Sequence, residues 1–260
     1  IDPVEIDSNR PIAAPVVGDI ASSVRLLLNG LERHPVKAPA DWLSAIDAAK
    51  RPNVAKMEEK LNAEAAPMNF FTALNAVRKV LSAHRDIYLV NEGANTLDDT
   101  RDVINMYLPR RRLDCGTWGV MGIGMGFAVG AAVTGKKPVV AIEGDSAFGF
   151  SGMEIDTVCR YKLPVTIVVF NNGGIYRGDD PNLGGGSDPS PTALSSSARY
   201  DKLIEAFGGA AYNAATPQEL ENALSAGLES GRPTLINCVI DPAAGTESGH
   251  IGSLNPKTLV

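Results

Sequence analysis

The chain has 260 residues, of which 44% are hydrophobic and 21% are charged, and its formal net charge is −6. A chain of this size buries a full hydrophobic core and forms one large or two modest domains. The acidic balance argues against general binding to nucleic acid or to an anionic membrane, because both need a basic surface. The three cysteines lack CxxC spacing and indicate neither a disulfide framework nor a zinc site, which favours a reducing, cytoplasmic location.

The opening segment is apolar, looks extended and has no initiator methionine, so we expect that the chain begins inside a longer polypeptide. Residues 18–31 place apolar side chains on one helical face, and either Asp19 or Ser22 could cap that helix. Residues 40–66 are charged and rich in alanine, and they predict a solvated helix that breaks near Pro52. We interpret these two helices as a tail and a linker.

Beyond residue 66, helical patterns alternate with short apolar runs. The expected helices are 69–83, 119–134, 151–161, 198–207 and 217–229, and the expected strands are 87–90, 138–142, 165–170 and 234–240. Strands that are apolar throughout and alternate with helices predict an α/β fold, a parallel sheet with helices on both faces. Residues 178–197 form a polar loop, either a mobile flap or a long surface connection.

Glycines are dense between Gly116 and Gly130, and each one in a helix costs about 1 kcal/mol relative to alanine. The spacing of Gly122, Gly124 and Gly126 does not match G-x-G-x-x-G, so a dinucleotide site is not expected. For Gly126 and Gly130 we expect tight helix packing instead.

Two of the predicted strands are followed by oxygen-bearing side chains. Asp145 follows the strand at 138–142, and Asn172 follows the strand at 165–170. Because ligands of parallel sheets bind at the carboxyl ends of the strands, both side chains are expected to meet there, with the carbonyl of Gly174 as a third oxygen. Mg²⁺ that also holds a diphosphate uses such ligands. In the alternative interpretation, Asp145 caps a helix and Asn172 belongs to an ordinary turn.

Long stretches of the chain resemble thiamine-diphosphate enzymes, and most closely the oxalyl-CoA decarboxylase family. These stretches are NEGANTLDDTRDVI, LDCGTWGVMGIGMGFAVGAAV, EGDSAFGFSGMEIDTVCRYKLPVTIVVFNNGGIYRG and GTESGHIGSLNP. The resemblance implies three parts: residues 1–35 as the remnant of a middle Rossmann-like domain, 36–66 as a linker, and 67–260 as the C-terminal thiamine-diphosphate-binding domain.

The resemblance also implies a set of site residues. The Mg²⁺ ligands would be Asp145, Asn172 and the Gly174 carbonyl. The thiamine diphosphate contacts would be Ala94, Asn95, Thr96, Gly119, Val120, Met121, Ser146, Ala147, Asn172, Gly174, Ile175 and Tyr176. The substrate contacts would be Arg101, Asp102, Glu247, Ser248 and His250, with Tyr176 and Ser248 as the catalytic residues.

The activity implied by the resemblance is the decarboxylation of oxalyl-CoA to formyl-CoA and CO₂ with thiamine diphosphate and Mg²⁺. The family activates the cofactor with a glutamate from an N-terminal pyrimidine-binding domain of a second subunit, which implies a homodimer or homotetramer. That domain has no counterpart in these residues, so we expect the chain alone to be inactive. The alternatives are a 2-hydroxyacyl-CoA lyase and a non-catalytic module that binds Mg²⁺ and a diphosphate.

Overall fold

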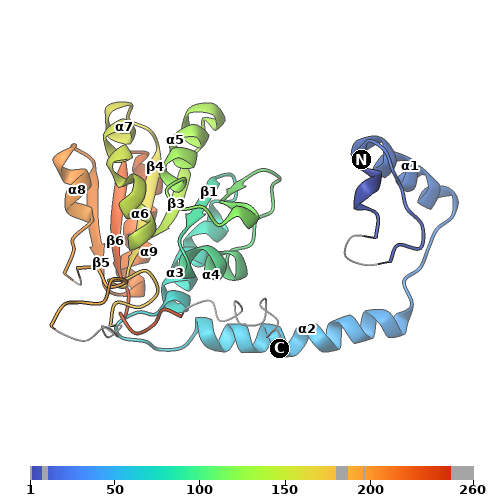
Figure 1. Cartoon of the computed structure of the whole chain (residues 1–260), viewed down its shortest axis with the longest axis horizontal. Helices are drawn as coiled ribbons and strands as arrows, with labels where there is room; N and C mark the ends of the chain where they lie inside the picture. Colours follow the sequence, from blue (N-terminus) through green and yellow to red (C-terminus); the bar gives the residue numbers. More distant parts are fainter. Residues whose placement is uncertain (1, 8–10, 180–186, 196, 247–260) are drawn as a thin grey trace, which may run out of the picture. The chain divides into compact units, whose positions relative to one another are not determined.

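The computed structural model describes residues 2–7, 11–179, 187–195 and 197–246 (Figure 1). The chain divides into two compact units, residues 1–56 and 57–260, and each is described by itself. The three-part division at residues 35 and 66 stays a prediction. Among the described residues, no helix combines the length and the apolar character that crossing a bilayer needs.

The first unit consists of helical segments. Pro3–Glu5 is a short 3₁₀ helix, so the expectation of an extended opening segment is wrong; Asp2 caps it and proline at its first position favours helical geometry. Helix α1 is Ile20–Arg33, and the Asp19 side chain accepts the Ser22 N–H at 2.9 Å, which settles its cap.

Helix α2 (Ala40–Leu61) runs through Pro52 without interruption, so the predicted break is wrong. Proline removes one hydrogen bond from a helix interior, at a cost of about 3 kcal/mol. Most residues on both sides are alanine, leucine, lysine, arginine, methionine or glutamate, which are strong helix formers and keep the helix continuous.

The second unit is built on a parallel sheet with the strand order β2-β1-β3-β4-β6-β5, which confirms the predicted fold class. The strands of the described residues are β1 (Tyr88–Glu92), β2 (Arg112–Leu113), β3 (Val139–Gly144), β4 (Val165–Asn171), β5 (Ala210–Ala214) and β6 (Thr234–Val239). The helices are α3 (Phe70–Ala83), α4 (Asn95–Val103), α5 (Gly124–Gly135), α6 (Asp145–Ser151), α7 (Ile155–Arg160), α8 (Asp201–Ala206) and α9 (Pro217–Ser230). Gly116–Trp118 and Gly152–Glu154 are 3₁₀ helices.

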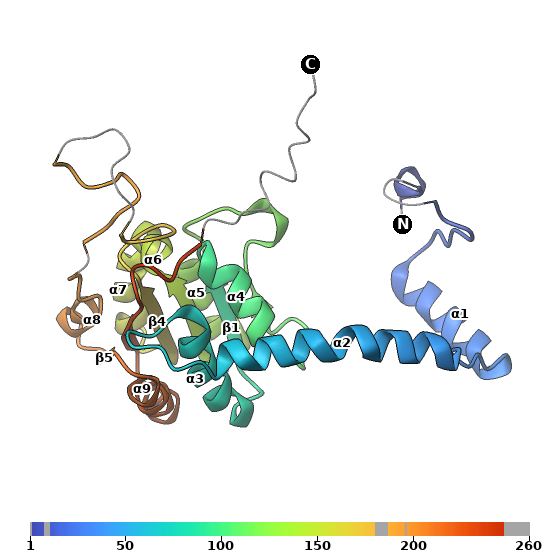
Figure 2. The same cartoon turned by 90° about the horizontal axis from the view of Figure 1, so that it is seen from below.

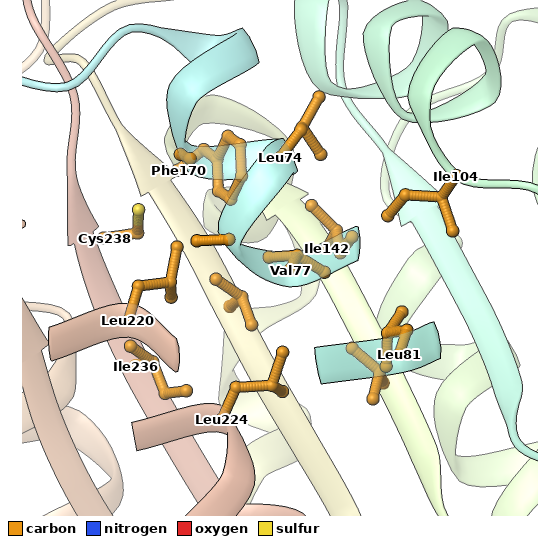
Figure 3. Packing of buried hydrophobic residues seen from close by; sticks show 14 of the residues in the cluster. Leu74, Val77, Leu81, Ile104, Ile142, Phe170, Leu220, Leu224, Ile236 and Cys238 are labelled. Carbon is orange, nitrogen blue, oxygen red and sulfur yellow. The ribbon is translucent and has the colours of Figure 1, made fainter. Parts of the chain in front are cut away.

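Each face of the sheet packs against its own layer of helices. On one face, α3 and α9 lie side by side (Figure 2) and bury a core with the sheet that includes Leu74, Phe170, Leu220 and Ile236 (Figure 3). On the other face, α5, α6, α7 and α8 contribute a second buried cluster. Strands buried on both faces explain why the sequence of β3 and β4 is apolar without alternation.

The strand register brings the carboxyl ends of β1, β3 and β4 level with one another. Glu92 pairs with Glu143, and Gly144 pairs with Phe170. The residues that directly follow β3 and β4 therefore emerge at the same edge of the sheet, as predicted.

Two predicted helix boundaries are wrong. The glycine-rich helix begins at Gly124 rather than at residue 119, because Gly119 and Gly122 have φ angles of 64° and 89°, which a right-handed helix excludes. The helix expected at 151–161 is three shorter pieces that begin at Asp145. The packing role expected for Gly126 and Gly130 is also wrong, since a Cβ at either would meet no atom within 4 Å.

Candidate functional site

Asp145 joins the ends of β3 and β4. It is the first residue of α6 and is 2% exposed. Its Oδ2 accepts the N–H groups of Gly173 and Gly174 at 2.7 and 3.2 Å, and its Oδ1 accepts the Ser146 N–H at 2.7 Å. Gly144, not Asp145, occupies the cap position of α6, so the interpretation of Asp145 as a helix cap is wrong. The carboxylate instead fixes the turn after the neighbouring strand.

Asn172, which directly follows β4, lies at the same edge. It is 3% exposed, and its Nδ2 donates to the carbonyl of Tyr176 at 2.8 Å. Because the amide nitrogen is committed to that carbonyl, the amide oxygen is the atom that remains to ligate a cation. The described residues contain no cluster of three or more His, Cys, Asp or Glu side chains suited to a metal. A cation at this edge would therefore rely on one carboxylate with amide and carbonyl oxygens, a set that suits Mg²⁺.

Burial raises the pKa of Asp145 to about 6, and the N–H groups of Ser146, Gly173, Gly174 and Asn172 oppose that rise. A carboxylate that has lost its water needs compensation for its charge. A divalent cation supplies this compensation, so the electrostatics of Asp145 fit a metal ligand.

A cavity of about 810 Å³ opens beside Asp145, and a smaller recess adjoins it. The walls of the two hollows include most of the predicted cofactor contacts, namely Ala94, Asn95, Thr96, Gly119, Met121, Ser146, Ala147, Asn172, Gly174, Ile175 and Tyr176. Val120, the remaining predicted contact, is 48% exposed. The structure thus brings residues more than 80 positions apart in sequence to one hollow at the carboxyl edge of the sheet.

The predicted substrate contacts fall into two groups. Arg101 and Asp102 lie on the wall of the cavity. Glu247, Ser248 and His250 lie outside the described residues. The chain just before them reaches the cavity, because Thr246 lies on its wall and its N–H donates to Asn95 Oδ1 at 3.0 Å.

Arg101 is held by an ion pair. Its Nη2 and Nε donate to the two oxygens of Asp114 at 2.7 and 3.0 Å, and the Arg101 guanidinium lowers the pKa of Asp114. Asp114 Oδ1 also accepts the N–H of Gly116 at 2.8 Å. A contact between Arg101 and the substrate, as the resemblance implies, would have to share the guanidinium with Asp114.

Two glutamates of the cavity edge were missed from the sequence. Glu92 is 2% exposed and accepts hydrogen bonds from the N–H groups of Gly122 and Gly124. Glu143 is fully buried, and burial together with the Glu92 carboxyl raises its pKa well above the usual range. In the sequence, each is an acidic residue at the end of an apolar run. That pattern indicates where the strand ends but does not predict a buried carboxyl group.

Asp99 on α4 also faces the cavity and gives a pH-dependent prediction. Burial, with smaller contributions from Asp102 and Asp98, raises its pKa from 3.8 to about 6. The unfolded chain therefore loses this proton first as the pH rises, and the fold loses stability between about pH 4 and pH 6. We expect Asp99→Asn to stabilise the protein by about 1 kcal/mol above pH 6 and to have no effect at pH 4, after allowance for partial exposure.

Thermal unfolding at pH 4 and pH 8 checks this expectation for Asp99. The half-exposed Asp156, which pairs with Arg160 one helical turn away, provides the control substitution Asp156→Asn. An equal gain for Asp99→Asn at both pH values would contradict the proposed origin of the effect.

The parallel sheet, with oxygen-bearing side chains gathered at its carboxyl edge, is typical of an α/β domain that binds a cofactor at that edge. Residues 95–238 match the family model described as thiamine pyrophosphate enzyme, C-terminal TPP binding domain. The chain belongs to the thiamine pyrophosphate enzyme family.

Relatives of this chain include two kinds of acyl-CoA enzyme. It is 64% identical over 259 residues to oxalyl-CoA decarboxylase of Escherichia coli (strain K12), an alignment that covers 100% of this chain and 46% of that protein. It is 44% identical to 2-hydroxyacyl-CoA lyase of Oryza sativa subsp. japonica, over 96% of this chain and 45% of that protein. The chain thus spans about half the length of the curated relatives that it matches.

Solved structures share the fold. Benzoylformate decarboxylase from Polynucleobacter necessarius superposes with a TM-score of 0.57 at 24% identity, over 70% of this chain and 35% of that chain. The thiamine diphosphate-dependent 4-hydroxybenzoylformate decarboxylase of Rhodococcus jostii RHA1 gives a TM-score of 0.56 at 22% identity, over 70% and 34%. At this identity the likeness shows the architecture alone.

Proposed function

We propose that this chain supplies the Mg²⁺- and diphosphate-binding part of an enzyme that decarboxylates oxalyl-CoA to formyl-CoA and CO₂. The observation that carries the proposal is the junction of Asp145 with the turn at Gly173 and Gly174, beside a cavity of about 810 Å³. The 64% identity with an oxalyl-CoA decarboxylase along the whole chain supports the choice of substrate.

The residues at the edge of the sheet fit a metal-bound diphosphate. Asp145, the amide oxygen of Asn172 and the carbonyl of Gly174 would hold the Mg²⁺. The N–H of Ser146 already donates to Asp145, so its hydroxyl is the group that remains for a diphosphate oxygen. Glycine at position 174 is required, because a Cβ there would collide with the backbone of Arg177. The turn therefore stays close enough to bring its backbone to the metal.

The remaining cavity residues would orient the organic part of the cofactor and the acyl group. Thiamine diphosphate supplies, when bound, a carbanion and an electron sink for the loss of CO₂. Met121 and Ile175 contribute apolar wall, and Asn95 links Thr246 to the carbonyl of Tyr176 by bonds of 3.0 and 3.4 Å. These contacts fix the geometry of the pocket before a ligand enters. Tyr176 and Ser248 stay proposed catalytic residues, and Glu247 and His250 stay proposed substrate contacts.

The proposal includes a partner. The glutamate that accepts the activating proton would come from an N-terminal pyrimidine-binding domain of a second subunit, in a homodimer or homotetramer in the cytoplasm. The matched relatives are about twice as long as this chain, which supports a contribution from residues outside it. Without that glutamate, we expect the 260-residue chain alone to bind cofactor weakly and to be inactive.

A 2-hydroxyacyl-CoA lyase is the second candidate, because a relative with that name is 44% identical to this chain. It shares the cofactor and the CoA group but releases an aldehyde. The 64% identity to the decarboxylase makes decarboxylation the better-supported activity.

The decisive assay uses the complete protein that carries this chain, with thiamine diphosphate, Mg²⁺ and oxalyl-CoA. We expect release of formyl-CoA and CO₂, and we expect the chain alone to be slower by a factor of at least about 10², the usual range for loss of an acid–base group being 10²–10⁴. Aldehyde release from a 2-hydroxyacyl-CoA with no product from oxalyl-CoA would favour the lyase. Cofactor binding without turnover of either substrate would favour a non-catalytic module.

A further inference from the structure

Glu92 ends β1 at the edge of the cavity but is not one of its wall residues. Its side chain points into the layer of α5, on the same face of the sheet as Val90. There its two carboxylate oxygens each accept one backbone N–H, Oε1 from Gly122 and Oε2 from Gly124. One buried side chain therefore fixes both ends of a three-residue turn.

The residue just before that turn, Met121, lies on a wall of the cavity. Met121, which lies between Gly119 and Gly122, faces both the cavity and the adjoining recess. The backbone here cannot rely on helical hydrogen bonds, since Gly119 and Gly122 are left-handed and α5 begins only at Gly124. The Glu92 carboxylate supplies the acceptors that this segment needs.

Glu92 is also bonded to the segment that follows β1. The next four residues, 93–96, line the cavity or the adjoining recess, and α4 begins at Asn95. The carbonyl of Glu92 accepts a hydrogen bond from the Thr96 hydroxyl, and Gly93 between them has a φ angle of 125°. A Cβ at Gly93 would collide with Thr96 Oγ1, so this connection is tightly constrained. Glu92 therefore joins two segments of the chain. Its backbone carbonyl accepts a hydrogen bond from Thr96, and its carboxylate accepts hydrogen bonds from Gly122 and Gly124.

We propose that Glu92 is a positioning residue, which links the turn at residues 122–124, next to Met121, to residues 93–96 and thereby sets the affinity of the cavity for its cofactor. The inference rests on the proposed function for the identity of that cofactor. It assigns no contact between Glu92 and the ligand. Its action passes through the backbone of Gly122 and Gly124.

Glu92→Gln is the informative substitution. The amide keeps the size of the side chain but offers one acceptor oxygen, so one of the two N–H groups faces an NH₂ group and loses its partner. The substitution also removes a carboxylate next to the buried Glu143, whose two oxygens have no hydrogen-bond partner among the described residues. The fold is therefore expected to keep its stability while the turn loosens.

The test measures the complete protein in two states. In the cofactor-free protein, we expect amide hydrogen exchange of residues 119–124 to be about ten-fold faster in Glu92→Gln, with no change in Tm beyond about 2 °C. With Mg²⁺ present, calorimetric titration with thiamine diphosphate is expected to give about ten-fold weaker binding, equivalent to about 1.4 kcal/mol. Glu221→Gln, at the surface ion pair with Lys79, is the matched control and is expected to change neither readout.

The outcomes separate the two proposals. Unchanged exchange and unchanged cofactor affinity in Glu92→Gln would overturn the positioning role and leave the proposed function standing. A loss of affinity that only parallels a large fall in Tm would overturn it as well, and Glu92→Asp, which keeps the charge but shortens the reach, would then show the same parallel loss. If the wild-type protein binds no thiamine diphosphate, the proposed function fails, while the exchange measurement still tests whether Glu92 holds the turn.

Discussion

Replacing Asp145 with alanine is expected to weaken Mg²⁺-dependent retention of thiamine diphosphate by about 100-fold or more. Loss of a residue that only supports a metal ligand lowers metal affinity about 10–100-fold, and Asp145 is placed to be a ligand itself. The substitution also leaves the N–H groups of Gly173 and Gly174 without their acceptor, so the turn after β4 loses its anchor. The measurement is the amount of cofactor that remains on the complete protein after desalting in Mg²⁺.

Asp86→Ala provides the control for this experiment. Asp86 forms ion pairs with Arg111 and Lys137, and it precedes β1 at the amino end of the strands. We expect Asp86→Ala to leave cofactor retention unchanged, because Asp86 lies at the edge of the sheet opposite to Asp145. If the wild-type protein and Asp145→Ala retain the same amount of cofactor, Asp145 is not a metal ligand. The proposed function would then lose the observation that carries it.

Replacing Gly124 with alanine is expected to destabilise the protein by about 3 kcal/mol, the upper range for overpacking a buried site. A Cβ at Gly124 would collide with the carboxyl groups of Glu92 and Glu143, which are both enclosed between the sheet and α5. Neither carboxyl can withdraw freely, since Glu92 is bonded to the N–H of Gly124 itself. Thermal unfolding is expected to show a Tm lower by about 6–12 °C.

Gly126→Ala, two residues further along α5, is the matched substitution. Nothing lies within 4 Å of a Cβ at that position, so alanine should stabilise the helix by up to about 1 kcal/mol. The opposite signs expected at Gly124 and Gly126 make the pair diagnostic. Similar effects at both positions would show that the carboxyl pair does not enclose Gly124.

The meeting of Asp145 and Asn172 at one edge of the sheet was predictable from the sequence because it depends on chain order alone. Asp145 and Asn172 follow two strands that are apolar throughout, and parallel strands present their carboxyl ends together. No side-chain contact had to be known. The same argument located Gly174, whose position follows from that of Asn172.

Other elements left little trace in the sequence. Strand β5 is an exposed edge strand with the sequence AAYNA, which lacks the β-branched residues that mark β3 and β4. Helix α4 begins at Asn95 without a side-chain cap and is mostly polar, so it did not stand out from the loop before it. The Glu92 bonds were invisible because they join residues 30 and 32 positions apart through backbone N–H groups.

The level strand ends also limit how the length of such a domain can vary during evolution. One residue inserted in β3 would advance Asp145 by about 3.3 Å and turn Glu143 toward the helices of the other layer. Asp145 could then no longer accept the N–H groups of Gly173 and Gly174, and Glu143 would no longer lie beside Glu92. Insertions and deletions are therefore compatible with the site only outside the strands, in connections such as residues 104–111, while substitutions within the strands can accumulate as long as they stay apolar.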